Sequence, residues 1–472
     1  MRNSLLKKFF SSSLQAISVQ ILGTVFFYII SVYLDKKDFG IISWANAVSM
    51  FIITMLSCGM EQVMVRRIAV SKSSDWAAAA YLFHAVITSL VAFSFLLFIN
   101  IALKDKDGSY HYLIWFFSVQ AIVYISVPFR QFLNAKERFG PFGAIALISN
   151  ICKLLITILL IRGNKLSIIS VALVLVGCAV FELTALLIYI TAKTNFRWYF
   201  KFIAYKKLFQ ESLPQYIAVI FDSSLSRMDW ILLGIISTKV VTADYSFAYR
   251  AYEIARLPIL IIAPIILPKF ARRLATGNNL SDTTKNHINQ LFALEMFFAV
   301  FMTLCLNIVW ARWIGGITHG KYGSSNAVEF FILSLCIPLQ FFINLLWTLS
   351  FAGRKYRAVS KVTVITAITN IVLNLILIPI YGGIGAAIAF LISSSIQVIG
   401  YYRLIKDIML LSYRSFVGFV IIATTAYIAA IYLSDIIIVR LVIAVVLYSI
   451  ISVVLQQIGN KHLQLLKLYF RK

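Results

Sequence analysis

Long apolar runs constrain this 472-residue chain more than any other feature. Fourteen of them follow one another, each close to the ~20 residues that a helix needs to cross the hydrocarbon core of a bilayer. Backbone N–H and C=O groups find no water there, so such runs must be helical. We predict an all-α polytopic membrane protein with spans near residues 14–34, 41–65, 76–103, 113–133, 144–161, 168–192, 213–236, 246–268, 288–311, 327–352, 362–380, 386–402, 415–433 and 436–457.

The composition excludes a soluble protein and a separate catalytic module. Hydrophobic residues make up 61% of the chain and charged residues only 13%, whereas soluble domains average roughly 45–50% and 25%. No polar stretch is long enough for an ATPase or glycosyltransferase domain. We therefore expect no enzymatic activity.

The basic residues predict the orientation. The chain has 43 Lys and Arg against 18 Asp and Glu, a net charge of +25. If the N-terminus is cytoplasmic, 29 of the 43 fall in the cytoplasmic connections and termini, as the positive-inside rule requires. We expect both termini in the cytoplasm. Because the cations are scattered among apolar segments rather than gathered on one face, we expect contact with membrane lipid and no nucleic-acid partner.

Weak internal similarity suggests two lobes. Residues 40–47 and 243–250 share a Ser, aromatic, Ala pattern at matching offsets, which is typical of transporters built from repeats. The predicted domains are an N-terminal six-helix lobe (1–192), an interfacial amphipathic linker (193–212), a C-terminal six-helix lobe (213–405), and helices 13 and 14 with a cytoplasmic tail (406–472).

The linker carries an aromatic stripe at helical spacing. Trp198, Phe202, Tyr205 and Phe209 recur every three or four residues among several Lys and Arg. This pattern predicts a helix that lies at the membrane surface. Its role is either to anchor the connection between the lobes or to guide a lipid substrate.

Eight ionisable side chains fall deep inside the expected spans, where a charge costs ~2.5–3.5 kcal/mol. They are Lys153, Glu182, Asp222, Arg227, Asp229, Arg250, Glu253 and Arg256; Glu61 lies nearer a span end. One interpretation is mutual neutralisation, for example Glu182 with Lys153 and Asp229 with Arg250. The other is that Lys153, Arg227, Arg250 and Arg256 face a shared cleft and bind an anionic group, since arginine pairs well with phosphate.

The remaining reactive residue types predict no cofactor or metal. The five Cys and five His are dispersed without ligand spacing.

Several segments together resemble Wzx-type polysaccharide flippases, which belong to the superfamily of lipid II flippases and MATE exporters. They are Gly23, Phe26, Phe27, Leu34–Phe51, Cys58–Ala69, Arg227–Asp229, Leu232–Gly234, Tyr245, Ala248, Tyr249, Pro258 and Asn370–Ala387. The order and spacing of these segments, over most of residues 10–405, carry the resemblance.

The resemblance implies two six-helix bundles in a V around a cationic cavity. The implied substrate is an undecaprenyl diphosphate-linked oligosaccharide, moved across a bacterial inner membrane by a proton or sodium gradient. It adds Arg66 and Arg67 to the substrate-binding candidates Lys153, Arg227, Arg250 and Arg256. The ion-coupling candidates are Glu182, Asp222, Asp229, Glu253 and Glu61. Other expected partners are a polysaccharide polymerase and a chain-length regulator, as for O-antigen, capsule or exopolysaccharide synthesis.

Other functions remain open at this point. A MATE-type antiporter for organic cations would depend on an unpaired carboxylate and tolerate loss of the arginines. Fourteen spans also fit a lipid II flippase. A membrane-embedded glycosyltransferase or ligase would need large outward loops, which the expected topology lacks.

Overall fold

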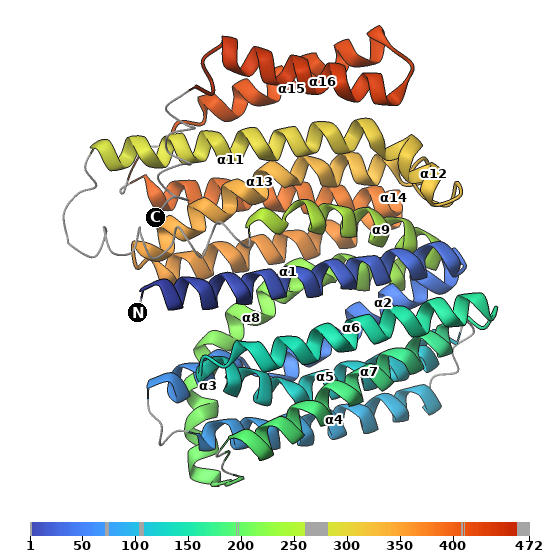
Figure 1. The fold of residues 1–472 in the computed structure, drawn as a ribbon, viewed down its shortest axis with the longest axis vertical. Helices are drawn as coiled ribbons and strands as arrows, with labels where there is room; N and C mark the ends of the chain where they lie inside the picture. Colours follow the sequence, from blue (N-terminus) through green and yellow to red (C-terminus); the bar gives the residue numbers. More distant parts are fainter. Residues whose placement is uncertain are drawn as a thin grey trace. The chain divides into compact units, whose positions relative to one another are not determined.

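The computed structural model describes residues 2–70, 75–102, 108–194, 196, 198–259, 282–406, 409 and 411–459. All regular secondary structure in these ranges is helical (Figure 1). By its internal contacts the chain divides into two compact units, Met1–Ala243 and Asp244–Lys472. Each unit is described by itself below.

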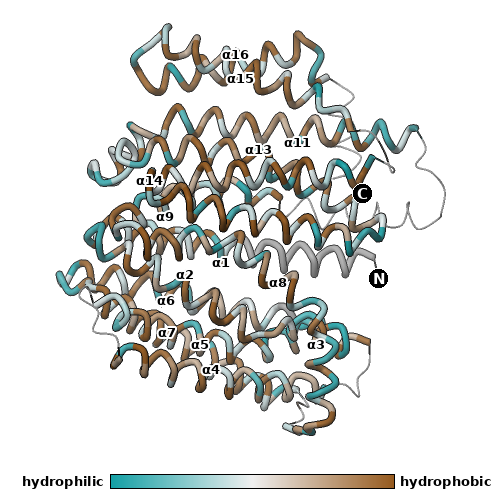
Figure 2. Tube along the Cα trace, turned by 180° about the vertical axis from the view of Figure 1, so that it is seen from behind, coloured by the Kyte–Doolittle hydropathy of each residue, from teal (hydrophilic) through white to brown (hydrophobic). Residues whose placement is uncertain are grey.

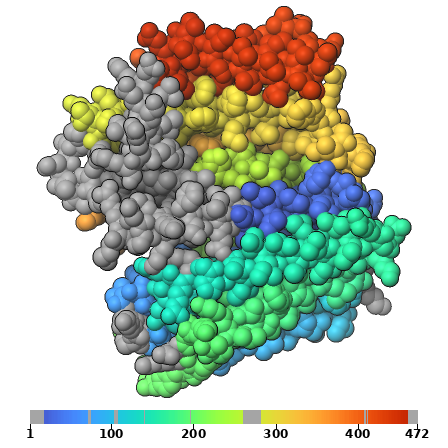
Figure 3. Space-filling model, in the orientation of Figure 1, coloured from blue at the N-terminus to red at the C-terminus, as the bar shows by residue number. Residues whose placement is uncertain are grey.

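Unit 1 is a helical bundle. Its helices are α1 (Arg2–Tyr33), α2 (Lys36–Leu56), α3 (Met60–Val70), α4 (Trp76–Ala102), α5 (Ser109–Ala135), α6 (Phe139–Arg162), α7 (Ile168–Lys193), α8 (Phe202–Ile236) and the start of α9 (Lys239–Ala255). Helix α5 is central, because it packs against α2, α4 and α7. Helices α6 and α7 lie side by side along one face of the unit (Figure 3).

Unit 2 contains the rest of α9 and the following helices. They are α11 (Asp282–Val309), a π-helical turn (Trp310–Ile314), α12 (Gly315–Ile317), α13 (Ala327–Ala352), α14 (Tyr356–Ile405), α15 (Arg414–Leu433) and α16 (Ile437–Val454). Helix α13 packs along α14 and α11, and the α15–α16 pair packs on α11.

The chain is a multi-pass membrane protein, as the apolar runs predicted. Ten helices of the described residues are long and apolar enough to cross a membrane, among them α4, α5, α6 and α7. Hydrophobic residues predominate along these helices (Figure 2), and many large hydrophobic side chains are exposed, such as Leu90, Phe98 and Leu159. Exposed apolar surface on this scale suits hydrocarbon rather than water.

Two expected spans are joined in α14. Residues 356–405 form one helical stretch with a single non-helical residue, Gly382, at φ 56° and ψ −127°. Only glycine adopts such a conformation at little cost. The predicted break between residues 380 and 386 is therefore correct. The expected span over 246–268 lies partly outside the described residues.

The prediction of one unbroken span over 41–65 is wrong. Helix α2 ends at Leu56 and α3 begins at Met60. The turn between them needs left-handed backbone at Cys58 (φ 48°) and Gly59 (φ 67°). Hydropathy does not reveal such a turn, since Ser57, Cys58 and Gly59 leave the mean hydropathy of the run high.

The linker also differs from a separate surface helix. Helix α8 begins at Phe202 and runs without a break to Ile236, and Trp198 precedes it. The side chains of Tyr205 and Phe209 pack onto the core of unit 1. Helix α8 as a whole packs against α2, α3 and α4. The assignment of residues 193–212 to a membrane interface, and the lobe boundaries, stay predictions.

A buried histidine ties these elements together. His84 on α4 is only 6% exposed. Its Nε2 lies 2.7 Å from the Leu56 carbonyl oxygen, and its Nδ1 lies 3.0 Å from the Tyr205 hydroxyl. A carbonyl only accepts, so Nε2 carries a proton and donates to Leu56, whereas either Nδ1 or the Tyr205 hydroxyl can donate in the second hydrogen bond. The end of α2 and the start of α8 are thereby held against α4.

The helices α2, α8 and α9 meet at two glycines. A Cβ on Gly40 would lie 1.8 Å from the Lys239 carbonyl oxygen, and one on Gly234 would lie 2.0 Å from Cδ1 of Trp44. Real Cβ atoms never approach so closely, so both positions require glycine for packing.

We predict that Gly40→Ala lowers stability by about 1–3 kcal/mol, the usual cost of overpacking. Thermal unfolding of purified full-length protein in detergent measures the effect. Gly177→Ala on α7 is the matched control, because its added Cβ meets nothing within 4 Å; alanine should stabilise a helix there by roughly 0.5–1 kcal/mol. Equal melting temperatures for the two variants would contradict the packing argument.

Candidate functional site

Lys153 is a half-buried cation without an ion-pair partner among the described residues. It lies on α6, and its Nζ donates to Oδ1 of Asn150 at 3.0 Å, one turn earlier. The same Nζ lies 5.3 Å from the centre of the Phe26 ring on α1. An amide and an aromatic face stabilise an ammonium without neutralising it. The positive charge of Lys153 is therefore available to an anion.

Glu182 on α7 lies near Lys153 without pairing to it. It interacts electrostatically with Lys153 and with Arg130 on α5. No direct ion pair of Glu182 occurs within the described residues. The predicted neutralisation of Lys153 by Glu182 is thus a longer-range interaction.

Arg130 is a half-buried residue that the sequence analysis did not select. Its Nη2 donates to the Val123 carbonyl oxygen at 3.1 Å, and it interacts electrostatically with Glu61 and Glu182. Glu61 on α3 accepts a hydrogen bond from Gln131 on α5. Arg130 lies inside the expected span 113–133, three residues before its end. This position was the signal in the sequence that could have identified it.

Arg67 forms an ion pair with Glu211. Its Nε and Nη2 donate to the carboxylate of Glu211 on α8 at 2.9 and 2.5 Å, and its guanidinium lies 5.3 Å from the Trp76 ring. This bidentate pair joins α3 to α8. Arg66, by contrast, is exposed. The two arginines proposed from the resemblance therefore differ in environment.

Helix α8 carries three further candidates. Asp222 is exposed, Arg227 is half-buried and Asp229 is buried. The Arg227 guanidinium lies 5.5 Å from the Trp230 ring. Their spacing of five and two residues does not align all three on one face of the helix. Asp222 and Asp229, seven residues apart, share a face of the helix but differ in burial.

Of the candidates of unit 2, Arg250 and Glu253 lie on α9, and Arg256 directly follows it. Arg250 Nη1 donates to Glu253, one turn later, at 2.7 Å. Arg256 Nη1 donates instead to the Tyr252 hydroxyl at 3.0 Å, and its guanidinium lies 5.2 Å from that ring. Tyr252 is fully buried. Arg256 therefore keeps a positive charge that a neutral partner holds in place.

The cations thus form one set in each unit. Lys153, Arg130 and Arg227 belong to unit 1, whereas Arg250 and Arg256 belong to unit 2. The convergence of both sets on a common cleft, and the pairing of Asp229 with Arg250, stay predictions. Within the described ranges no group of three His, Cys, Asp or Glu could hold a metal ion.

A protein-family model and a curated relative match the sequence. The family described as "Polysaccharide biosynthesis protein" matches residues 5–274, more than half of the chain. The capsular polysaccharide biosynthesis protein CapF of Staphylococcus aureus is 25% identical over 211 residues. That match covers 43% of this chain and 51% of CapF. The chain therefore spans about half the length of this relative.

Solved transporter structures share the fold. The lipid II flippase MurJ, in an inward closed conformation, matches with a TM-score of 0.77 at 15% identity, over 94% of this chain and 98% of MurJ. An inward-facing multidrug resistance transporter of the MATE family matches at 0.67 and 12% identity, over 83% and 98%. The Vibrio cholerae MATE transporter VcmN, as a D35N mutant, matches at 0.58 and 13%, over 86% and 98%. The expected superfamily fold is confirmed.

The Arg67–Glu211 pair predicts a pH-dependent stability. Hydrogen bonds from Arg67 lower the pKa of Glu211. The pair therefore stabilises the protein above the unfolded pKa of about 4.3 and is lost as the pH falls through the lower folded value. We expect Arg67→Gln to cost about 0.2–1 kcal/mol at pH 7, since Glu211 is one-third exposed.

Thermal unfolding between pH 7 and pH 3 tests this expectation. The difference between wild type and Arg67→Gln should shrink as the pH falls. Arg66→Gln is the matched control, because Arg66 acts on Glu211 only through longer-range electrostatics and should change stability less. A constant difference across the pH range would show that Glu211 does not sense Arg67.

Proposed function

The chain belongs to the polysaccharide biosynthesis protein family, and on that premise we propose that it is a lipid-linked oligosaccharide flippase. Its substrate would be an undecaprenyl diphosphate-linked repeat unit, moved from the cytoplasmic to the periplasmic face of a bacterial inner membrane. Both termini would be cytoplasmic. The translocated unit would then pass to a polymerase and a chain-length regulator. The CapF relative favours capsule among the possible polysaccharides.

The observation that carries this proposal is a set of half-buried cations held by neutral groups. Asn150 and the Phe26 ring hold Lys153, and Tyr252 holds Arg256. A charge inside an apolar helix is costly and generally serves a pathway or a ligand. A diphosphate is the part of the proposed substrate that such cations would bind, through charge-assisted hydrogen bonds.

Carboxylates beside these cations support coupling to an ion gradient. Glu182 interacts with Lys153 and Arg130, and Glu253 pairs with Arg250. Glu253 and the diphosphate would compete for Arg250, which would link substrate binding to binding of an ion at Glu253. Glu61, Asp222 and Asp229 are the other coupling candidates. Binding of substrate and proton would thereby be linked.

Two other functions have support from the fold. MurJ and the MATE transporters share it, so a lipid II flippase and a cation antiporter are the alternatives. A lipid II flippase would use the same diphosphate-binding cations. A cation antiporter would need an unpaired carboxylate and no arginine.

We expect Lys153→Ala and Arg256→Ala each to reduce surface polysaccharide at least tenfold in a strain that lacks the chromosomal copy. Undecaprenyl-linked repeat units should accumulate on the cytoplasmic face. Immunoblots of surface polysaccharide and labelling of the lipid-linked intermediate measure the two effects, with membrane abundance of each variant checked.

Lys165→Ala is the matched control, because Lys165 is an exposed lysine just beyond the end of α6. It should support normal polysaccharide. Normal polysaccharide with Lys153→Ala and Arg256→Ala would overturn the proposal, and dependence on Glu182 alone would favour the cation antiporter. Loss of peptidoglycan precursor transport instead would identify a lipid II flippase.

A further inference from the structure

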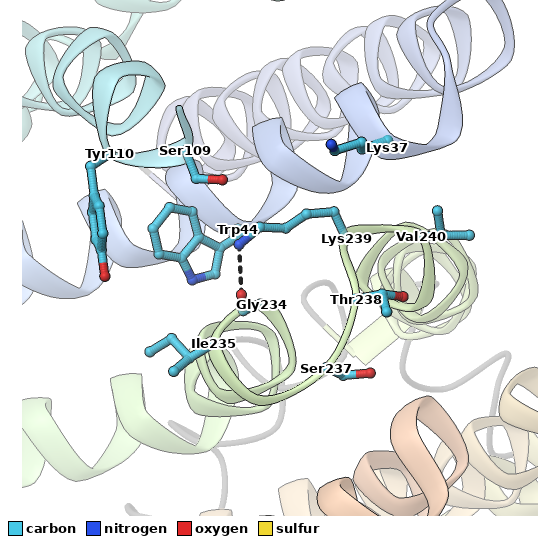
Figure 4. A pocket seen from close by; sticks show the side chains of 10 residues that line it. All are labelled: Lys37, Trp44, Ser109, Tyr110, Gly234, Ile235, Ser237, Thr238, Lys239 and Val240. Atoms are coloured by element: carbon cyan, nitrogen blue, oxygen red, sulfur yellow. Dashed lines mark hydrogen bonds between the residues drawn. The ribbon is translucent and has the colours of Figure 1, made fainter. Parts of the chain in front are cut away.

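Unit 1 contains a polar cavity of about 410 Å³ at the junction of four helix ends. It lies where α2, α5 and α9 begin and where α8 ends (Figure 4). The cavity is lined by Lys37, Trp44, Ser109, Tyr110, Gly234, Ile235, Ser237, Thr238, Lys239 and Val240. None of these residues belongs to the cationic candidates above. Its volume falls within the roughly 300–1,000 Å³ of small-molecule sites.

Lys239 builds one wall of the cavity. Its Nζ donates to the Gly234 carbonyl oxygen at the end of α8, at 2.6 Å, and lies 4.1 Å from the centre of the Trp44 ring. The Trp44 and Tyr110 rings meet edge to face at 6.0 Å between centroids. These contacts fix α2, α5, α8 and α9 around the cavity. The site is therefore preformed.

Two cations line the cavity. They are Lys37 and Lys239, and none of the lining residues that the structure describes is acidic. Helices α2 and α5 begin here without a side-chain cap on their first N–H groups, and helix N-termini favour anions. In Figure 4 the Lys37 ammonium and the Ser109 hydroxyl point toward each other across the open space.

Two buried polar atoms in the lining lack a hydrogen-bond partner. Ser109 and Trp44 are each only 4% exposed. Neither Oγ of Ser109 nor Nε1 of Trp44 has a partner within the described part of the chain. A buried polar group left unpaired costs about 1–3 kcal/mol. A ligand that bonds to the Ser109 hydroxyl would recover that cost.

We propose that this cavity binds an acidic sugar, with the carboxylate at Lys37 and Ser109. Ser237 and Thr238 provide hydroxyls, and Tyr110 provides an aromatic side chain, for the neutral part of the sugar. A phosphate ion would fill only a small part of 410 Å³ and would leave these groups unused. The hydroxyl and aromatic lining therefore favours a uronic acid over a bare anion.

The choice of a sugar rests on the proposed function. In the proposed orientation the cavity lies at the periplasmic ends of the helices. It would hold an acidic residue of the oligosaccharide at the outer face, apart from the cations that bind the diphosphate. The site would thereby favour repeat units that contain a uronic acid.

Binding of digalacturonic acid to purified full-length protein in phosphatidylcholine nanodiscs tests the proposal. Isothermal titration calorimetry should show saturable binding, at least tenfold tighter than binding of the neutral digalactose. Lys37→Gln and Ser109→Ala should each weaken binding at least fivefold. Lys165→Gln, which removes an exposed lysine outside the cavity, should bind as wild type does.

Three results would overturn the proposal. They are equal binding of the neutral disaccharide, unchanged binding by both Lys37→Gln and Ser109→Ala, and displacement of digalacturonic acid by equimolar inorganic phosphate or by phosphatidylglycerol in the nanodisc. Each variant should keep the melting temperature of the wild type, and Ser109→Thr, which keeps the hydroxyl, should bind better than Ser109→Ala.

This test is independent of the flippase proposal. Lys153→Ala should bind digalacturonic acid normally while losing transport. If Lys153→Ala transports normally and the cavity still binds the acidic sugar, the flippase mechanism fails and the binding site stands. If transport is lost in Lys153→Ala and no acidic sugar binds, the cavity proposal fails alone.

Discussion

Hydrocarbon offers backbone groups no hydrogen-bond partner, and the rest of this structure depends on that constraint. Every apolar run must satisfy its own N–H and C=O groups, so the described chain is helical. Where a helix has to stop, another group takes over the unpaired atoms. The Leu56 carbonyl oxygen at the end of α2 accepts from His84, and the Gly234 carbonyl oxygen near the end of α8 accepts from Lys239. These side chains thus satisfy backbone carbonyl groups at helix ends, and they also join neighbouring helices.

The same lack of water makes each buried cation depend on its neighbours. A charge inside the bundle is tolerated when neighbours stabilise it, and the kind of neighbour decides whether the charge remains available. A carboxylate cancels the charge, as Glu211 does for Arg67. An amide or an aromatic ring lowers the cost and leaves the charge, as Asn150 does for Lys153 and Tyr252 does for Arg256. Under the proposed function, a neutral partner would mark a cation whose charge is already available to substrate, whereas Arg250 would first have to leave Glu253.

The sequence predicted those features that follow from hydropathy and its interruptions. Helices α4 to α7 and the break at Gly382 were predicted, because long apolar runs define the helices and the expected spans 362–380 and 386–402 leave Gly382 between them. The turn at Cys58 and Gly59 was missed, since neither residue lowers the hydropathy of the apolar run that contains it. The packing of Tyr205 against His84 was missed as well. An aromatic stripe at helical spacing has the same sequence pattern whether it faces lipid or a neighbouring helix. Contacts between distant segments decide such cases.

Glycine packing links the cavity of unit 1 to the rest of the bundle. Gly40 and Gly234 bring α2 and α8 so close that Lys239 reaches both the Gly234 carbonyl oxygen and the Trp44 ring. A larger residue at either position would push the helices apart and open these contacts. Helices α2 and α8 also lead away from the cavity toward α3 and the Arg67–Glu211 pair. A ligand in the cavity would therefore contact two helices that lead to α3, one of which, α8, packs against α3 at the Arg67–Glu211 pair.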